Sequence, residues 1–225
     1  GVYQLSDFDV QRDGSYLIKP SLPTNGSARA NIRPGDAKFV DQNGDGTITA
    51  ADNAVIGRAL PLHTGGFNNT FVYKNLSLNV FFQWNYGNKV MNANRIVLEG
   101  NYQNVAINQY ASYAGRWSME NQGSDIPRAK GHGPTGYYTS RTLEDGSFLR
   151  LKTLQLAYSL PKKFVKKLGM RSINVNFACQ NLFTWTNYSG VDPEVSTRNT
   201  TLTPGFDYSA YARNRIYTFG LQLDF

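Results

Sequence analysis

Cysteine, charge and long apolar runs are all scarce in this chain of 225 residues. A single cysteine, Cys179, excludes an intrachain disulfide framework and a cysteine-based zinc cluster. No apolar run approaches the roughly 20 residues of a membrane-spanning helix, which excludes a helical membrane protein. Charged residues are 17% of the chain, below the ~25% of an ordinary soluble domain. An initiator methionine and a signal peptide are also missing, which predicts a processed product or a fragment.

Patterns that would indicate catalysis are missing as well. The chain has two histidines, His63 and His132, both in segments expected to be loops, and its Ser, Asp and Glu residues show no catalytic spacing. No glycine-rich phosphate loop follows a strand, and Cys179 lies on an apolar strand face, where a thiol is inert. We therefore expect no enzymatic activity. Disorder is excluded too, because 13% of the residues are aromatic and disordered chains lack them.

What the sequence does contain is period-two alternation of apolar and polar residues, which is typical of β-strands. From Leu76 to Tyr86 every even position is apolar and most odd positions are polar. Leu149 and Leu151 fall out of phase with the apolar residues that follow them, which predicts a β-bulge or a strand end. Short helices are expected at 162–168 and within 94–114. The alternation predicts five long strands, at 67–74, 76–86, 153–160, 172–185 and 217–225.

The connections between these strands alternate between short and long. Residues 74–75 and 161–171 are short turns, whereas 87–147 and 186–215 are long loops. Short periplasmic turns and long extracellular loops characterise outer-membrane β-barrels, whose strands need about 9–11 residues to cross the bilayer. The prediction is therefore an all-β fold, a section of a transmembrane antiparallel β-barrel, with residues 1–66 as a further extracellular loop segment. Five strands are too few to close a barrel, since the smallest has about 8; the alternative is a soluble β-sandwich.

One loop, residues 41–52, has the spacing of a calcium-binding loop. Oxygen ligands at its positions 1, 3 and 5 are followed by Gly46 at the sharp turn, a backbone carbonyl at position 7 and a carboxylate at position 12. Calcium takes six to eight oxygen ligands, which explains the clustering. The alternative is an Asn/Asp/Gly turn without metal. The predicted Ca²⁺ ligands are Asp41, Asn43, Asp45, Thr47 and Asp52.

A basic cluster lies in the predicted periplasmic turn, made of Lys162, Lys163, Lys166, Lys167 and Arg171. It is either a contact with anionic headgroups of the outer-membrane lipid or a solvated turn. Nucleic acid binding is not expected, because the cluster lacks interleaved aromatic residues.

Aromatic residues gather at the ends of the predicted strands, as in the interfacial girdles of membrane barrels. Others lie in the predicted outer loops, where their rings can stack on a sugar or a peptide side chain or pack within the loops. The candidate substrate-binding residues among them are Trp117, Tyr137 and Tyr138.

Several short segments together resemble a known family. In chain order they are Gly1–Gln4, Pro34–Asp36 with Lys38-Phe39 and the 41–52 loop, Ile56-Gly57, Pro61, Gly65-Gly66, Arg116-Trp117 with Asn121, Pro127 and Arg128, Phe148–Lys152, Tyr158–Pro161, Asn181–Phe183, Tyr188–Glu194 and Phe225. With these segments the chain resembles the SusC/RagA-like TonB-dependent outer-membrane transporters of Bacteroidetes.

The resemblance implies the C-terminal section of a 22-stranded barrel in the cell outer membrane. It also implies active import of oligosaccharides or peptides, a SusD-like surface lipoprotein as a lid, and coupling to the TonB complex through an N-terminal region that this chain does not include. The chain would then form barrel wall, outer vestibule and lid interface. The hypothesis from another class is a secreted β-rich glycan-binding module with a structural calcium loop.

Overall fold

The computed structural model describes every residue except 101–106, 132, 134–137 and 198–202. Two residues discussed above, His132 and Tyr137, lie outside the described residues. The chain divides into two compact units. Unit 1 contains residues 1–57 and 91–143, and unit 2 contains residues 58–90 and 144–225. The segments expected to be the first and second outer loops thus contribute most of unit 1.

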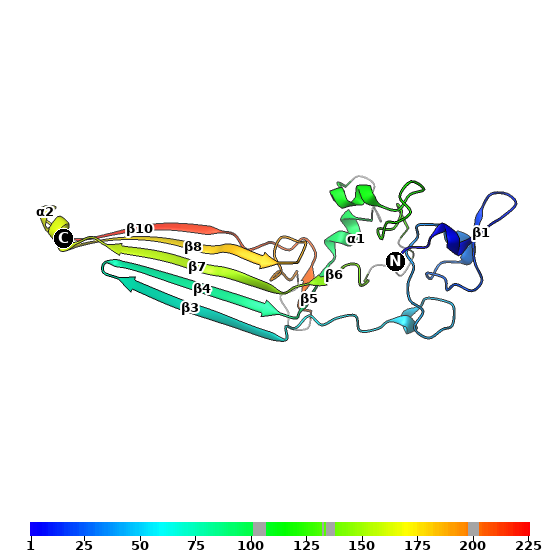
Figure 1. Ribbon diagram of the computed structural model, residues 1–225, viewed down its shortest axis with the longest axis horizontal. Coiled ribbons are helices and arrows are strands. Elements are labelled where there is room, and N and C mark those ends of the chain that lie inside the picture. Colours follow the sequence, from blue (N-terminus) through cyan, green and yellow to red (C-terminus); the bar gives the residue numbers. More distant parts are fainter. Residues whose placement is uncertain (101–106, 132, 134–137, 198–202) are drawn as a thin grey trace. The chain divides into compact units, whose positions relative to one another are not determined.

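Unit 2 is built on an antiparallel sheet of five long strands, in the order β10-β8-β7-β4-β3 (Figure 1). The strands are β3 (His63–Tyr73), β4 (Leu76–Tyr86), β7 (Phe148–Ser159), β8 (Ser172–Thr186) and β10 (Ile216–Asp224). Each long strand pairs with the next one along the chain. Their lengths run from 9 to 15 residues. The five predicted strands are confirmed, with β3 and β7 beginning earlier than the alternation indicates.

A β-bulge lies where the apolar pattern of β7 changes phase. The pairing of β7 with both neighbours passes from Leu151 directly to Thr153, which leaves Lys152 out of the ladder. One extra residue reverses the side to which the following side chains point. Leu149 and Leu151 therefore share a face with Leu154, and the predicted bulge is confirmed.

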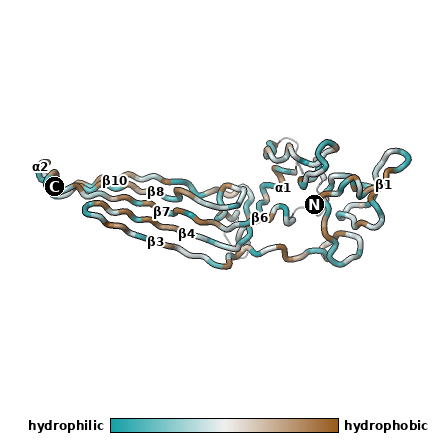
Figure 2. Tube along the Cα trace, in the orientation of Figure 1, coloured by the Kyte–Doolittle hydropathy of each residue, from teal (hydrophilic) through white to brown (hydrophobic). Residues whose placement is uncertain are grey.

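One face of this sheet is apolar and remains exposed. Phe71 on β3, Phe183 on β8 and Phe219 on β10 are 58%, 51% and 71% exposed. The opposite face carries polar side chains such as Asn79 and Gln155, which pair directly across β4 and β7. Figure 2 shows the alternation of apolar and polar residues along the five strands. In a soluble sandwich the apolar face would be covered by a second layer, so its exposure disfavours that alternative.

The connections at one end of the sheet are short. Between β3 and β4 stand only Lys74, with a positive φ of 53°, and Asn75. Between β7 and β8 lies the helix α2 (Lys162–Lys167), where the sequence predicts a short helix. α2 contacts β8, and its Val165 is 2% exposed, so one side chain anchors the helix to unit 2.

Unit 1 consists of short elements around a small core. Tyr3, Phe8, Ile18 and Ile32 are almost fully buried and form one cluster. β1 pairs with β2 in antiparallel fashion. The elements are η1 (Leu5–Asp7), β1 (Phe8–Val10), β2 (Tyr16–Ile18), η2 (Arg29–Asn31), η3 (Ala50–Asp52), α1 (Asn94–Leu98) and η4 (Ala111–Gly115).

A second, smaller sheet has the strand order β6-β5-β9. Its strands are β5 (Lys89–Asn92), β6 (Leu143–Asp145) and β9 (Phe206–Asp207). All three lie within segments that the sequence predicts as outer loops, so those loops carry regular structure of their own. In the described part of the chain, no helix has the length and apolarity to cross a membrane.

Candidate functional site

The 41–52 loop is wound tightly by hydrogen bonds from its own backbone. The Asp41 carboxylate accepts the N–H of Gly44 at 2.7 Å and the N–H of Gly46 at 2.8 Å. Asp45 accepts the N–H of Thr47 at 2.8 Å. Gly46 has a φ of +81°, a left-handed conformation that glycine adopts without strain. The backbone of Gly46 therefore makes the sharp turn that the calcium-loop spacing predicts at this position.

Asp52 closes this loop. One of its oxygens accepts the N–H of Gln42 at 2.9 Å and the other accepts the N–H of Thr49 at 2.7 Å. These bonds, that of Thr49 first, lower the pKa of the Asp52 carboxyl, which favours its charged form. Ile48 is buried, at 7% exposure, as expected for the apolar residue of the loop.

The loop residues fit a calcium ion in the kind of ligand they offer. The carboxylates of Asp41, Asp45 and Asp52 accept hydrogen bonds from N–H groups of the loop, and Asn43 donates to Asp45 at 2.9 Å. Carboxylate and amide oxygens are the kind of ligand that calcium takes. Among the described residues, however, no three His, Cys, Asp or Glu side chains gather as a group that could hold a metal ion. The Asn43 amide and the Thr47 carbonyl would have to complete the ligand set.

A cavity of about 470 Å³ opens beside this loop in unit 1. It is within the range of small-ligand sites, about 300–1,000 Å³. Its lining combines side chains of the loop with others from distant segments, among them Gln42, Asp52, Lys38, Tyr138 and Arg141.

The three candidate aromatic residues have different surroundings. Tyr138 is 66% exposed and lines the cavity. Trp117 is 6% exposed, and its Nε1 donates to the Gln4 side chain at 3.3 Å. Its ring lies against Gly35, where an added Cβ would be 2.3 Å from the ring, so stacking on a ligand would require this packing to open. Tyr137 is outside the described residues.

An ion-pair cluster on the polar face of the sheet is not apparent from the sequence. The guanidinium of Arg150 on β7 is 2% exposed and donates to Asp192 and Glu194, each at 2.6 Å. It also donates to Thr184 on β8 at 2.9 Å. These bonds tie the 186–215 loop to the sheet.

Further contacts surround this cluster. The N–H of Arg213 donates to Asp192 at 3.1 Å, and Gln83 on β4 donates to Glu194 at 3.4 Å. Lys152, the bulged residue of β7, in turn donates to Gln83. The cluster therefore joins β4, β7 and β8 to both ends of one loop. The sequence shows only a basic residue among the polar positions of a strand and two carboxylates in a distant loop. These features do not identify the residues as ion-pair partners.

No family model matches the chain. It is 37% identical to the TonB-dependent receptor P3 of Formosa agariphila over 197 residues, which are 85% of this chain and 19% of that relative. It is 26% identical to the TonB-dependent receptor SusC of Bacteroides thetaiotaomicron over 204 residues, 87% of this chain and 18% of that relative. The chain spans about a fifth of the length of the curated relatives it matches.

A solved structure described as that of the RagAB peptide transporter is similar with a TM-score of 0.68 and 26% sequence identity. The similarity covers 97% of this chain and 22% of the chain in that structure.

Proposed function

We propose that this chain, which resembles TonB-dependent receptors of the SusC/RagA kind over most of its length, is a section of the barrel wall of an outer-membrane nutrient importer. The observation that carries the proposal is the five-stranded sheet, with long strands, one exposed apolar face and one polar face. An apolar face in contact with lipid and a polar face toward a water-filled interior is the arrangement of outer-membrane barrels.

In this proposal the chain supplies a wall and loops, with no part in a chemical reaction. The polar face of β4, β7 and β8 borders the interior of a closed, 22-stranded barrel completed by residues outside this chain. Arg150 holds the 186–215 loop over that face through Asp192 and Glu194, and so gives the outer vestibule a fixed wall. The relatives are named as receptors and as a transporter, which supports the absence of enzymatic activity.

Cysteine labelling tests the orientation of the sheet. In the full protein with Cys179→Ala, single cysteines replace Asn79 or Gln155 on the polar face and Val80 or Leu154 on the apolar face. A membrane-impermeant maleimide should label the first two and spare the second two, because only the interior is wet. Equal labelling of both faces would contradict the proposal.

The transported substrate is proposed to be an oligosaccharide or a peptide, taken up with a SusD-like surface lipoprotein as lid and with energy from the TonB complex. The similar RagAB structure is described as a peptide transporter, and the oligosaccharide alternative comes from the resemblance to the SusC/RagA-like family. Uptake of a labelled peptide mixture and of a labelled oligosaccharide mixture, compared between a deletion strain and its complemented strain, distinguishes the two. Unchanged uptake of both would remove the import function.

We further propose that the 41–52 loop binds Ca²⁺ through Asp41, Asn43, Asp45, Thr47 and Asp52, and stiffens unit 1 near the lid interface. The supporting observations are the calcium-loop spacing, the left-handed turn at Gly46 and the oxygen ligands that the loop offers. Binding of Ca²⁺ measured by calorimetry should be detectable in the parent, with the weak affinity of extracellular calcium modules, and lost in Asp45→Ala. Equal binding by the two would contradict the metal site.

A further inference from the structure

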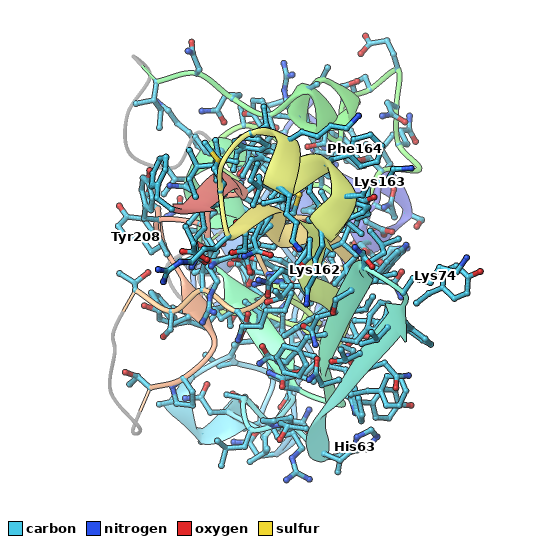
Figure 3. The ribbon with its side chains drawn as sticks, turned by 90° about the vertical axis from the view of Figure 1, so that its left-hand side faces the viewer. His63, Lys74, Lys162, Lys163, Phe164 and Tyr208 are labelled. Atoms are coloured by element: carbon cyan, nitrogen blue, oxygen red, sulfur yellow. The ribbon has the colours of Figure 1, made fainter. Side chains whose placement is uncertain are left out.

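α2 is an amphipathic helix at the short-turn end of the sheet. At about 100° per residue, Lys162, Lys163, Lys166 and Lys167 fall on one side of the helix. Phe164, Val165 and Leu168, the residue that follows α2, fall on the other side. Figure 3 views the molecule from this end, with α2 in front and Lys162, Lys163 and Phe164 labelled.

The apolar side of α2 is only partly used by the fold. Val165 is 2% exposed, but Phe164 and Leu168, one helical turn apart, are 59% and 63% exposed. Burying two large side chains in hydrocarbon is favourable by the hydrophobic effect. Within the described part of this chain, Phe164 and Leu168 both stay exposed. Val165, in contrast, is buried where α2 contacts β8.

Aromatic side chains continue the apolar surface at this end of the sheet. Tyr73 at the end of β3 and Tyr158 near the end of β7 are 70% and 41% exposed. Both belong to the exposed apolar face, through their pairing with Leu76. The Lys74 ammonium lies 5.2 Å from the centre of the Tyr73 ring. Rings with adjacent cations are characteristic of the boundary between hydrocarbon and headgroups.

The charge at this end of the sheet is strongly positive. The cations of the two short connections are Lys74, Lys162, Lys163, Lys166, Lys167 and Arg171, all exposed. Asp224 of β10 also lies at this end, where its carboxylate accepts a hydrogen bond from the hydroxyl of Ser172. In the described residues, none of the six cations forms an ion pair. A surface of this kind is complementary to clustered phosphates.

We propose that α2 lies in the periplasmic boundary of the outer membrane and selects anionic phospholipid. Phe164 and Leu168 enter the edge of the hydrocarbon, and the lysines contact the headgroup phosphates. This is the arrangement of an interfacial amphipathic helix. The inference rests on the proposed barrel function, which places the apolar face of the sheet in the same bilayer. It adds a lipid-binding surface on a turn that the transport function itself does not require.

Spin-label accessibility tests the insertion of α2. The full protein with Cys179→Ala is reconstituted in nanodiscs containing phosphatidylglycerol, with one label at position 163, 164, 168 or 219. Labels at 164, 168 and 219 should be more accessible to oxygen than to a water-soluble nickel complex, and the label at 163 should show the reverse. If the label at 164 is exposed to water while the label at 219 is exposed to lipid, the inference about α2 is overturned and the proposed barrel function stands. A wet label at 219 would overturn the barrel function and, with it, the inference.

Lipid retention tests the role of charge. Native mass spectrometry of the detergent-extracted protein should detect bound phosphatidylglycerol in preference to phosphatidylethanolamine. Changing the four lysines of α2 to glutamine should lower that preference by about tenfold or more, since each cation near an anionic surface strengthens attraction several-fold. Glutamine has a helix propensity similar to that of lysine, so α2 itself should persist. The matched control removes four exposed cations from other segments, with Arg12→Gln, Arg58→Gln, Lys130→Gln and Arg215→Gln.

The control variant should retain phosphatidylglycerol as the parent does. Equal retention by the lysine variant and the parent would overturn the lipid surface. So would loss of preference in the control alone, because the attraction would then depend on charge elsewhere. Recovery of a soluble protein bound to α2, with no lipid preference, would identify a different occupant and would also overturn the proposal.

Discussion

Replacing Arg150 by methionine should release the 186–215 loop from the sheet. The Arg150 side chain is 2% exposed, and its partners Asp192 and Glu194 are 5% and 11% exposed. Removing one partner of a buried ion pair costs about 3–5 kcal/mol. Without Arg150, Asp192 loses its guanidinium partner, and Glu194 keeps the longer ion pair with Arg213 at 3.5 Å. Methionine retains much of the side-chain volume, so the loss is mainly electrostatic.

The magnitude can be read from local hydrogen exchange. The N–H groups of Glu194 and Arg213 both donate to Asp192, at 3.0 and 3.1 Å. If the loop opens more easily by about 3–5 kcal/mol, the exchange of these two amides should accelerate by roughly a hundredfold to several thousandfold. The assay is hydrogen–deuterium exchange with mass spectrometry on the full protein in detergent micelles.

Two further variants sharpen this test. Arg150→Met combined with Asp192→Asn and Glu194→Gln neutralises the two carboxylates and keeps an acceptor oxygen at position 192 for the two amides. It should restore part of the protection, because the cost of a buried unpaired charge is removed. Arg215→Met removes an exposed arginine and should leave exchange unchanged. Protection in Arg150→Met equal to that of the parent would refute the reasoning, because the loop would then be held by other contacts.

Three other predictions concern unit 1. Gly35→Ala should destabilise the unit by about 1–3 kcal/mol, because its added Cβ meets Trp117 at 2.3 Å; in thermal unfolding Gly14→Ala, with a similar positive φ and open space, should cost less, and equal costs would contradict the clash. Burial raises the pKa of Tyr3 from 10.0 to about 12. The contribution of Tyr3 to the free energy of unfolding is therefore fully present below pH 10 and is lost between pH 10 and 12, because the tyrosine of the unfolded chain ionises first. Alkaline unfolding should be less steep in Tyr3→Phe than in the parent, and identical curves would rule out this cause. Chelation of Ca²⁺ should lower the midpoint of thermal unfolding in the parent and leave Asp45→Ala unchanged, whereas equal shifts would argue against the metal site.

The strands were predictable because side chains alternate between the two faces of a sheet. When one face is apolar and the other polar, apolar and polar residues alternate along the sequence. The bulge at Lys152 was predictable for the same reason, as Leu149 and Leu151 break the phase of the following residues. Asn181 also interrupts the apolar pattern of β8. The structure gives its reason in a φ of +53° and a hydrogen bond from its amide to the Asn214 carbonyl at 3.0 Å.

The ion-pair cluster and the core of unit 1 were not predictable from local patterns. Arg150 is 42 and 44 residues away from its two partners, and no periodicity connects a strand to an irregular loop. For Trp117 the structure shows the second of the two expected alternatives, packing within the predicted loops, but its contact with Gly35 could not be read from the sequence. Spacing along the chain predicts a turn or a strand, whereas burial in irregular structure depends on contacts between distant segments.

The measurement that tests the central claim most directly is the mass and location of the native polypeptide that contains these residues. An antibody against the 41–52 loop is applied to fractionated cells. We predict a species in the outer-membrane fraction that needs detergent for extraction and is about five times larger than the 25.1 kDa of this chain, since the chain covers about a fifth of its relatives. A species of 25.1 kDa that stays soluble without detergent would contradict the account.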